Sequence, residues 1–93
     1  MSDSRVLDFR PRARSLVIGD IVWLARIADK ARAHLAGRIG DYIYPCPADQ
    51  SFLREVGLTA DAFTRMVTEA ADDAQLVERL RAHLQAGAPS RTA

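Results

Sequence analysis

Apolar residues recur at helical spacing along the chain, and residues that end helices separate the stretches. The first stretch covers residues 15–36, where Ser15 or Asp20 could begin a helix and Gly37 could end it. At 100° per residue, one face of this helix collects six apolar side chains, those of Ile21, Leu24, Ile27, Ala28, Ala31 and Leu35. We therefore expect a long first helix whose apolar face belongs to the core.

The second half of the chain predicts three shorter helices, over residues 50–56, 60–70 and 74–86. Asp49 and Thr59 are the expected N-caps of the first two, and Asp72 or Asp73 that of the third. The inward faces of the last two contain Phe63, Met66 and Val67, and Leu76, Val77, Leu80 and Leu84. Gly57 and Gly87 stand where the first and the third of these helices should end.

The remaining segments lack helical periodicity. Residues 1–14 read as an extended arm, residues 37–48 as a rigid loop with two glycines and two prolines, and residues 88–93 as a frayed tail. The fold class is therefore all-α. We expect a single small domain over residues 15–87, a bundle of four helices with one long N-terminal helix and three shorter ones.

Composition narrows the class of protein. A chain of 93 residues supports one domain, and its 48% of hydrophobic residues is typical of a globular fold. Cys46 is the only cysteine, which excludes a disulfide framework or a multi-cysteine metal site within one chain. The first ten residues lack an apolar signal segment, and glycine and charged residues interrupt the longest apolar run. We expect a cytoplasmic protein without a membrane span, and we predict no metal or cofactor.

Charge is distributed unevenly along the chain. Residues 1–40 contain eight basic and four acidic residues, whereas residues 41–93 contain five and eight, for a net charge of +1. The arm has four arginines around a phenylalanine that could contact phosphates, namely Arg5, Arg10, Arg12, Arg14 and Phe9. A dedicated nucleic-acid binder usually has a larger basic excess, so a solvated terminus is the favoured interpretation.

Candidate functional residues lie along the border of the apolar face of the first helix. Trp23, Lys30 and His34 fall within about 40° of one another, and a half-buried lysine near an imidazole is a candidate nucleophile. The simpler interpretation places Trp23 at the core margin and extends Lys30 along the apolar surface. Asp29 and Arg32, with Lys30, could bind an anion or a polar metabolite, although weak surface ion pairs are the commoner role of such residues.

The loop contributes a second set of candidates. Cys46 lies between two prolines, twelve positions after His34, so a Cys–His pair could form if the loop folds back, although a buried apolar role is commoner for a lone cysteine. Tyr42 and Tyr44 would point to opposite sides of an extended segment, one toward the core and one toward a pocket or an interface. Asp49 is most simply a helix cap.

Two segments carry a family resemblance. One reads D-K-x-R-A and is formed by Asp29, Lys30, Arg32 and Ala33; the other reads G-x-Y-x-Y-x-C-P-x-D and is formed by Gly40, Tyr42, Tyr44, Cys46, Pro47 and Asp49. With them, nearly the whole chain apart from its tails resembles a family of small bacterial proteins, domain of unknown function 5069. The resemblance implies no activity. It implies that Trp23, Lys30 and His34 of the first helix belong together with the loop that contains Cys46.

Several functions remain open at this point. We favour a non-enzymatic binding or protein-interaction module with a groove between the first helix and residues 42–49. Its partner would be a small ligand or a protein, a second copy of the chain included. The alternative is a small enzyme or redox protein that uses Lys30, His34 or Cys46. Nucleic-acid contact through the arm is the weaker alternative, and no residue is assigned as catalytic.

Overall fold

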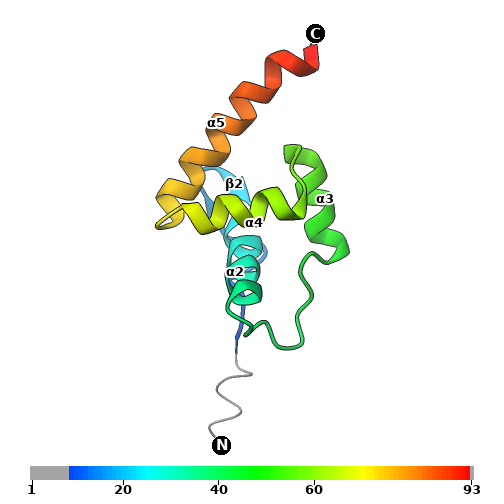
Figure 1. The fold of residues 1–93 in the computed structure, drawn as a ribbon, viewed down its shortest axis with the longest axis vertical. Helices are drawn as coiled ribbons and strands as arrows, with labels where there is room; N and C mark the ends of the chain where they lie inside the picture. Colours follow the sequence, from blue (N-terminus) through cyan, green and yellow to red (C-terminus); the bar gives the residue numbers. More distant parts are fainter. Residues whose placement is uncertain (1–8, 93) are drawn as a thin grey trace, which may run out of the picture.

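Four helices and one short hairpin make up the protein in the computed structural model, which describes residues 9–92 and the side chains of residues 9–86 (Figure 1). The elements in chain order are β1 (Val17–Ile18), β2 (Ile21–Val22), α2 (Leu24–Leu35), α3 (Pro47–Val56), α4 (Ala60–Glu69) and α5 (Asp73–Thr92). The predicted helical class with four helices is thus confirmed, and the hairpin is an addition to it. Arg5 of the predicted arm lies outside the described residues.

The first helix begins later than predicted, because a β-hairpin occupies its expected start. Val17 pairs with Val22 and Ile18 with Ile21 in antiparallel register. Gly19 and Asp20 form the turn, with φ of +57° and +65°, as a two-residue type I′ turn requires. Both N-caps predicted for this helix, Ser15 and Asp20, are therefore wrong. Two β-branched pairs around a Gly-Asp turn are a hairpin signal that outweighed the helical periodicity.

α2 is the centre of the fold, although it has only 12 residues. Four of the six side chains on its predicted apolar face are fully buried, namely Leu24, Ile27, Ala28 and Ala31. Ile21 belongs to β2 and packs at the margin of the core, while Leu35 in the last turn is 54% exposed, so its core assignment is wrong. Gly37 follows the helix with a φ of +71°, in agreement with the predicted end.

The longest helix is α5 rather than the first one. It runs from Asp73 to Thr92, past the end predicted at Gly87, so residues 88–92 are helical and not a frayed tail. One glycine in a helix interior costs about 1 kcal/mol, which is too little to end a helix by itself. Figure 1 shows α5 extending beyond the other helices.

The core forms where α2, α3, α4 and α5 meet. α4 crosses α2 in Figure 1, and Phe63 of α4 is fully buried at this crossing, with its ring edge-on to that of Phe52 at 6.3 Å. Val67, Leu76 and Leu80 complete the buried faces predicted for the last two helices. The fold thereby places one side of α2 against α3 and leaves another side for the N-terminal arm.

Candidate functional site

A buried ionic cluster joins α2 to the start of α3. The Lys30 Nζ atom lies 2.6 Å from Asp49 Oδ2, and the side chains are 3% and 0% exposed. The Trp23 indole N–H donates to Asp49 Oδ1 at 2.9 Å, and the Cys46 backbone N–H donates to Asp49 Oδ2 at 3.0 Å. The Lys30 ammonium also reaches Cys46 Sγ at 3.3 Å. Four predicted site residues therefore meet, and we call Trp23, Lys30, Cys46 and Asp49 the lysine cluster.

The start of α3 places Asp49 in this cluster. Cys46, and not Asp49, is the N-cap residue, and Pro47 occupies the first helical position. Asp49 is the third helical residue, and its carboxylate returns to the Cys46 backbone N–H to form a capping box. Asp49 thus takes part in capping the helix, as predicted, but from the third helical position and not as the N-cap. The helix starts three residues earlier than predicted.

Trp23 enters the cluster with an unusual backbone. Its φ is +77°, in the left-handed region that a bulky residue rarely adopts. The indole bond to Asp49 holds the side chain, and the guanidinium of Arg26 lies 5.8 Å from the centre of the ring. A strained backbone persists only where surrounding contacts determine it, so these contacts fix the start of α2.

The Asp49 carboxylate is ionised in this setting. Burial by itself would raise the pKa of Asp49, but the hydrogen bonds from Lys30, the Cys46 backbone and Trp23 together outweigh burial and lower it. Its partners occupy both oxygen atoms, and Asp49 and Cys46 flank the Lys30 ammonium. The lysine cluster is therefore a closed structural unit in which the Lys30 side chain is 3% exposed.

A second ionic cluster ties the N-terminal arm to α2 and α5. The guanidinium of Arg12 spans Asp29 and Asp73, with Nε 2.9 Å from Asp29 Oδ2 and Nη1 2.7 Å from Asp73 Oδ2. The Arg12 backbone N–H also donates to Asp29 at 2.8 Å, and Arg32 Nη1 donates to Asp73 at 3.1 Å. Asp29 and Arg32, predicted as neighbours of Lys30, thus belong to a separate cluster, which we call the arginine cluster.

Removing the Arg12 side chain should change the pKa of Asp73 and the way the stability of the protein depends on pH. The hydrogen bond from Arg12 is the main reason that the pKa of Asp73 is lowered. A carboxyl whose pKa is lower in the folded state contributes stability above its unfolded pKa, and that stability is lost as the pH falls through the folded value. In Arg12→Ala, we expect the pKa of Asp73 to rise toward its ordinary value in an NMR titration of carboxyl carbons.

The same substitution should lower the free energy of unfolding at neutral pH by about 1–2 kcal/mol, because the ion pairs are partly exposed. The wild type should then lose stability more steeply than Arg12→Ala when acidified from about pH 5 to about pH 2. Arg54→Ala removes an exposed arginine of α3 and serves as the control. Equal acid slopes in wild type and Arg12→Ala would contradict the assignment.

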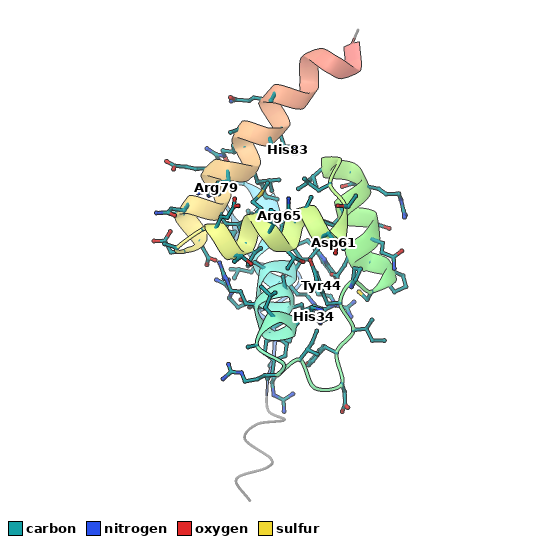
Figure 2. The ribbon with its side chains drawn as sticks, viewed as in Figure 1. His34, Tyr44, Asp61, Arg65, Arg79 and His83 are labelled. Carbon is teal, nitrogen blue, oxygen red and sulfur yellow. The ribbon has the colours of Figure 1, made fainter. Side chains whose placement is uncertain are left out.

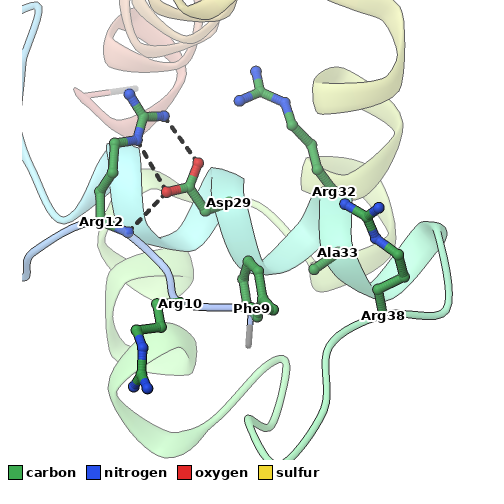
Figure 3. Close-up of a pocket in the computed structure, with 7 residues that line it drawn as sticks. All are labelled: Phe9, Arg10, Arg12, Asp29, Arg32, Ala33 and Arg38. Atoms are coloured by element: carbon green, nitrogen blue, oxygen red, sulfur yellow. Dashed lines mark hydrogen bonds and ion pairs between the residues drawn. The ribbon is translucent and has the colours of Figure 1, made fainter. Parts of the chain in front are cut away.

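An open pocket of about 380 Å³ lies beside the arginine cluster. Its lining consists of Phe9, Arg10, Arg12, Asp29, Arg32, Ala33 and Arg38, and we call it the arginine pocket. Figure 3 shows the bonded Arg12 and Asp29 at one end, Arg38 at the other, and Phe9 between them. The guanidinium of Arg32 lies near that of Arg12, because both donate to Asp73 Oδ1. Of its four guanidinium groups, those of Arg12 and Arg32 are bound to Asp29 and Asp73, so Arg10 and Arg38 give the pocket its positive charge.

Among the described residues, the side chains of the two tyrosines and of His34 make no hydrogen bond to either cluster, and Figure 2 shows His34 and Tyr44 near each other. The Tyr44 hydroxyl is 2.7 Å from Thr64 Oγ1 on α4, and burial raises the pKa of this phenol. His34 is exposed, with its ring 5.6 Å from that of Tyr44, and makes no side-chain hydrogen bond within residues 9–86. Tyr42 packs edge-on against Phe9 of the arm at 5.6 Å. Tyr44 thus faces the core and Tyr42 faces the arm.

Sequence reasoning missed how the arm takes part. Local patterns place Arg12 and Phe9 in a basic terminus and Asp73 at a helix cap, and they predict no role for Arg38. The pairing of Arg12 with Asp73 spans 61 positions, so no local pattern could reveal it. Arg38 directly follows the glycine that ends α2, which is a weak signal for a basic residue near a helix C-terminus.

The described part of the chain contains no group of three or more His, Cys, Asp or Glu side chains that could hold a metal ion. Nor does any helix among residues 9–92 have the length and apolar character needed to cross a membrane. The fold and its two ionic clusters define a small helical protein in which a buried Lys–Asp pair joins α2 to α3.

The family model described as Domain of unknown function (DUF5069) matches residues 9–93, and the chain belongs to this family. The match confirms the resemblance seen in the two sequence segments. A search of curated proteins found no match.

Proposed function

We propose that the protein is a non-enzymatic binding module that holds an anionic ligand in the arginine pocket. The observation that carries the proposal is the lining of this pocket, which combines four arginines with one carboxylate. Guanidinium groups bind phosphate and carboxylate oxygens through paired hydrogen bonds. Within residues 9–86, Arg10 and Arg38 have no carboxylate within 4.0 Å, so both remain available to a ligand.

The proposed pocket differs from the groove expected from the sequence. Between α2 and residues 42–49, the Lys30 ammonium contacts both Cys46 Sγ and the Asp49 carboxylate. The arginine pocket lies on a neighbouring face of α2, about 100° around the helix from Lys30. We therefore assign Asp29 and Arg32 to binding, and the lysine cluster to holding α2 and α3 in place.

The alternative of an enzyme or redox protein rests on one contact, the 3.3 Å between Lys30 Nζ and Cys46 Sγ. His34 takes no part in that contact, since it faces solvent near Tyr44. Nucleic-acid contact through the arm rests on Arg10 and Arg14, because Arg12 is already bound to two aspartates. Both alternatives have less support than the arginine pocket.

Titration of pyrophosphate into the protein by isothermal calorimetry tests the proposal. We expect saturable binding by the wild type and about tenfold weaker binding by Arg38→Ala, because a hydrogen bond to a charged group contributes about 1.5–3 kcal/mol. Arg54→Ala removes the same charge from an exposed position on α3 and should change the affinity by less than about twofold.

Two outcomes would overturn the proposal. One is the absence of saturable binding to pyrophosphate, inorganic phosphate and citrate. The other is an equal loss of affinity in Arg38→Ala and Arg54→Ala, which would show that net charge and not the pocket attracts the anion. Circular dichroism of each variant confirms that the helices are retained.

A further inference from the structure

The arginine pocket offers more than positive charge, and its other lining residues restrict the ligand. Asp29 contributes a carboxylate, and Phe9 and Ala33 contribute an apolar wall. A site that only collected inorganic anions would gain nothing from a carboxylate or a phenyl ring. A ligand that suits every lining residue needs an anionic group, a hydrogen-bond donor and an apolar surface.

The Asp29 carboxylate is positioned by Arg12 and can still accept one more hydrogen bond. Its Oδ2 atom accepts the backbone N–H and Nε of Arg12, and Oδ1 accepts Nη2 of Arg12 at 3.0 Å. A carboxylate has about four lone-pair sites, so one remains on Oδ1. The side chain is 18% exposed and lines the pocket. A ligand hydroxyl can donate to this oxygen, whereas a second anionic group placed there would be repelled.

The apolar wall is fixed in place by packing. The ring of Phe9 stands edge-on to that of Tyr42 with their centroids 5.6 Å apart, and Ala33 of α2 is 5% exposed. Figure 3 shows Phe9 between the Arg12–Asp29 pair and Arg38. A carbon skeleton that connects an anionic group at Arg38 to a hydroxyl at Asp29 therefore passes over the phenyl ring.

From this arrangement we infer that the ligand is a phosphate monoester of a small sugar or polyol. The phosphate lies against Arg38, a hydroxyl donates to Asp29, and the C–H face of the ligand packs on Phe9. A volume of about 380 Å³ is within the range of small-molecule sites and suits a monosaccharide phosphate. This inference rests on the proposed anion-binding function and adds the chemical class of the ligand.

Calorimetry with four probes tests the inference, namely ribose 5-phosphate, butyl phosphate, inorganic phosphate and ribose, in a buffer free of phosphate and sulfate. We expect ribose 5-phosphate to bind about tenfold more tightly than butyl phosphate, which lacks the hydroxyls, and ribose alone not to bind. Arg38→Ala should weaken all three phosphates. Phe9→Ala should weaken ribose 5-phosphate about fivefold more than inorganic phosphate, and Arg54→Ala should leave every affinity unchanged.

The outcomes separate this inference from the proposed function. If the phosphates bind through Arg38 but ribose 5-phosphate binds no more tightly than butyl phosphate, the sugar phosphate is overturned and the anion site stands. If none of the phosphates binds, pyrophosphate included, both the sugar-phosphate inference and the proposed anion-binding function are overturned. A short 5′-phosphorylated oligonucleotide that binds more tightly than ribose 5-phosphate would also overturn the inference, because the ligand would then be a nucleic-acid end.

Discussion

Asp49→Ala is expected to destabilise the protein by about 3–5 kcal/mol, the largest effect of any single change proposed for it. The substitution leaves the Lys30 ammonium buried without its carboxylate and removes the acceptor of the Trp23 indole N–H. An uncompensated buried charge is far more unfavourable than a lost surface ion pair. Urea denaturation at pH 7, monitored by circular dichroism, measures the change in the free energy of unfolding.

A loss of this size is a large part of the stability of a small domain, so Asp49→Ala could fail to fold. Two further variants keep the test decisive. Asp49→Asn retains an acceptor for Trp23 but not the charge, and should fall between wild type and Asp49→Ala. The double variant Lys30→Met/Asp49→Leu removes both charges together and should recover most of the loss. A double variant as unstable as Asp49→Ala would show that shape, and not charge pairing, governs this site.

The second large effect is expected at Gly19, in the turn of the hairpin. Gly19→Ala should destabilise the protein by about 2–4 kcal/mol, for two reasons. The φ of +57° is unfavourable for a residue with a Cβ atom, and that atom would overlap both methyl carbons of Val77 on α5. The Gly19 carbonyl also accepts a hydrogen bond from Arg81 at 3.0 Å, so the turn is held against α5 and has little room to shift.

A control and a double-mutant cycle separate the two causes. Gly37 has a φ of +71°, and a Cβ atom added there would meet nothing within 4 Å, so Gly37→Ala reports the backbone penalty alone, about 1 kcal/mol. Val77→Ala opens space beside the turn, and the loss in the double variant Gly19→Ala/Val77→Ala should be at least about 1 kcal/mol smaller than the sum of the single losses. Equal effects of Gly19→Ala and Gly37→Ala would contradict the packing of the hairpin on α5.

Local patterns predicted the second half of the protein well. Thr59 caps α4 and accepts a hydrogen bond from the Ala62 backbone at 3.0 Å, and Gly57 ends α3 with a positive φ, both as expected. Caps and glycine ends depend on residues within one helical turn, so the sequence alone contains what decides them. The same holds for the buried faces of α4 and α5, whose apolar spacing is that of an amphipathic helix.

The first half was predicted less well, because two local signals compete there. Residues 17–22 fit both a helical apolar face and a hairpin with a Gly-Asp turn. The close fit of Gly19 against Val77 belongs to the folded state, and this contact with α5 favours the hairpin. In the same way, Cys46 became the N-cap of α3 because Asp49 could then reach back to its backbone N–H and across to Lys30.

The sequence by itself determined the helical class, most helix ends and most of the core, since each follows from side-chain spacing within a few residues. Only the tertiary structure decided how the candidate site residues divide between the lysine cluster and the arginine cluster. Asp29 and Lys30 are adjacent in sequence, but successive residues of a helix point about 100° apart, so one meets the arm and the other meets α3. The partners on each face of α2 depend on long-range contacts, and those of the arginine cluster join residues 17 to 61 positions apart. Such contacts exist only once the chain has folded.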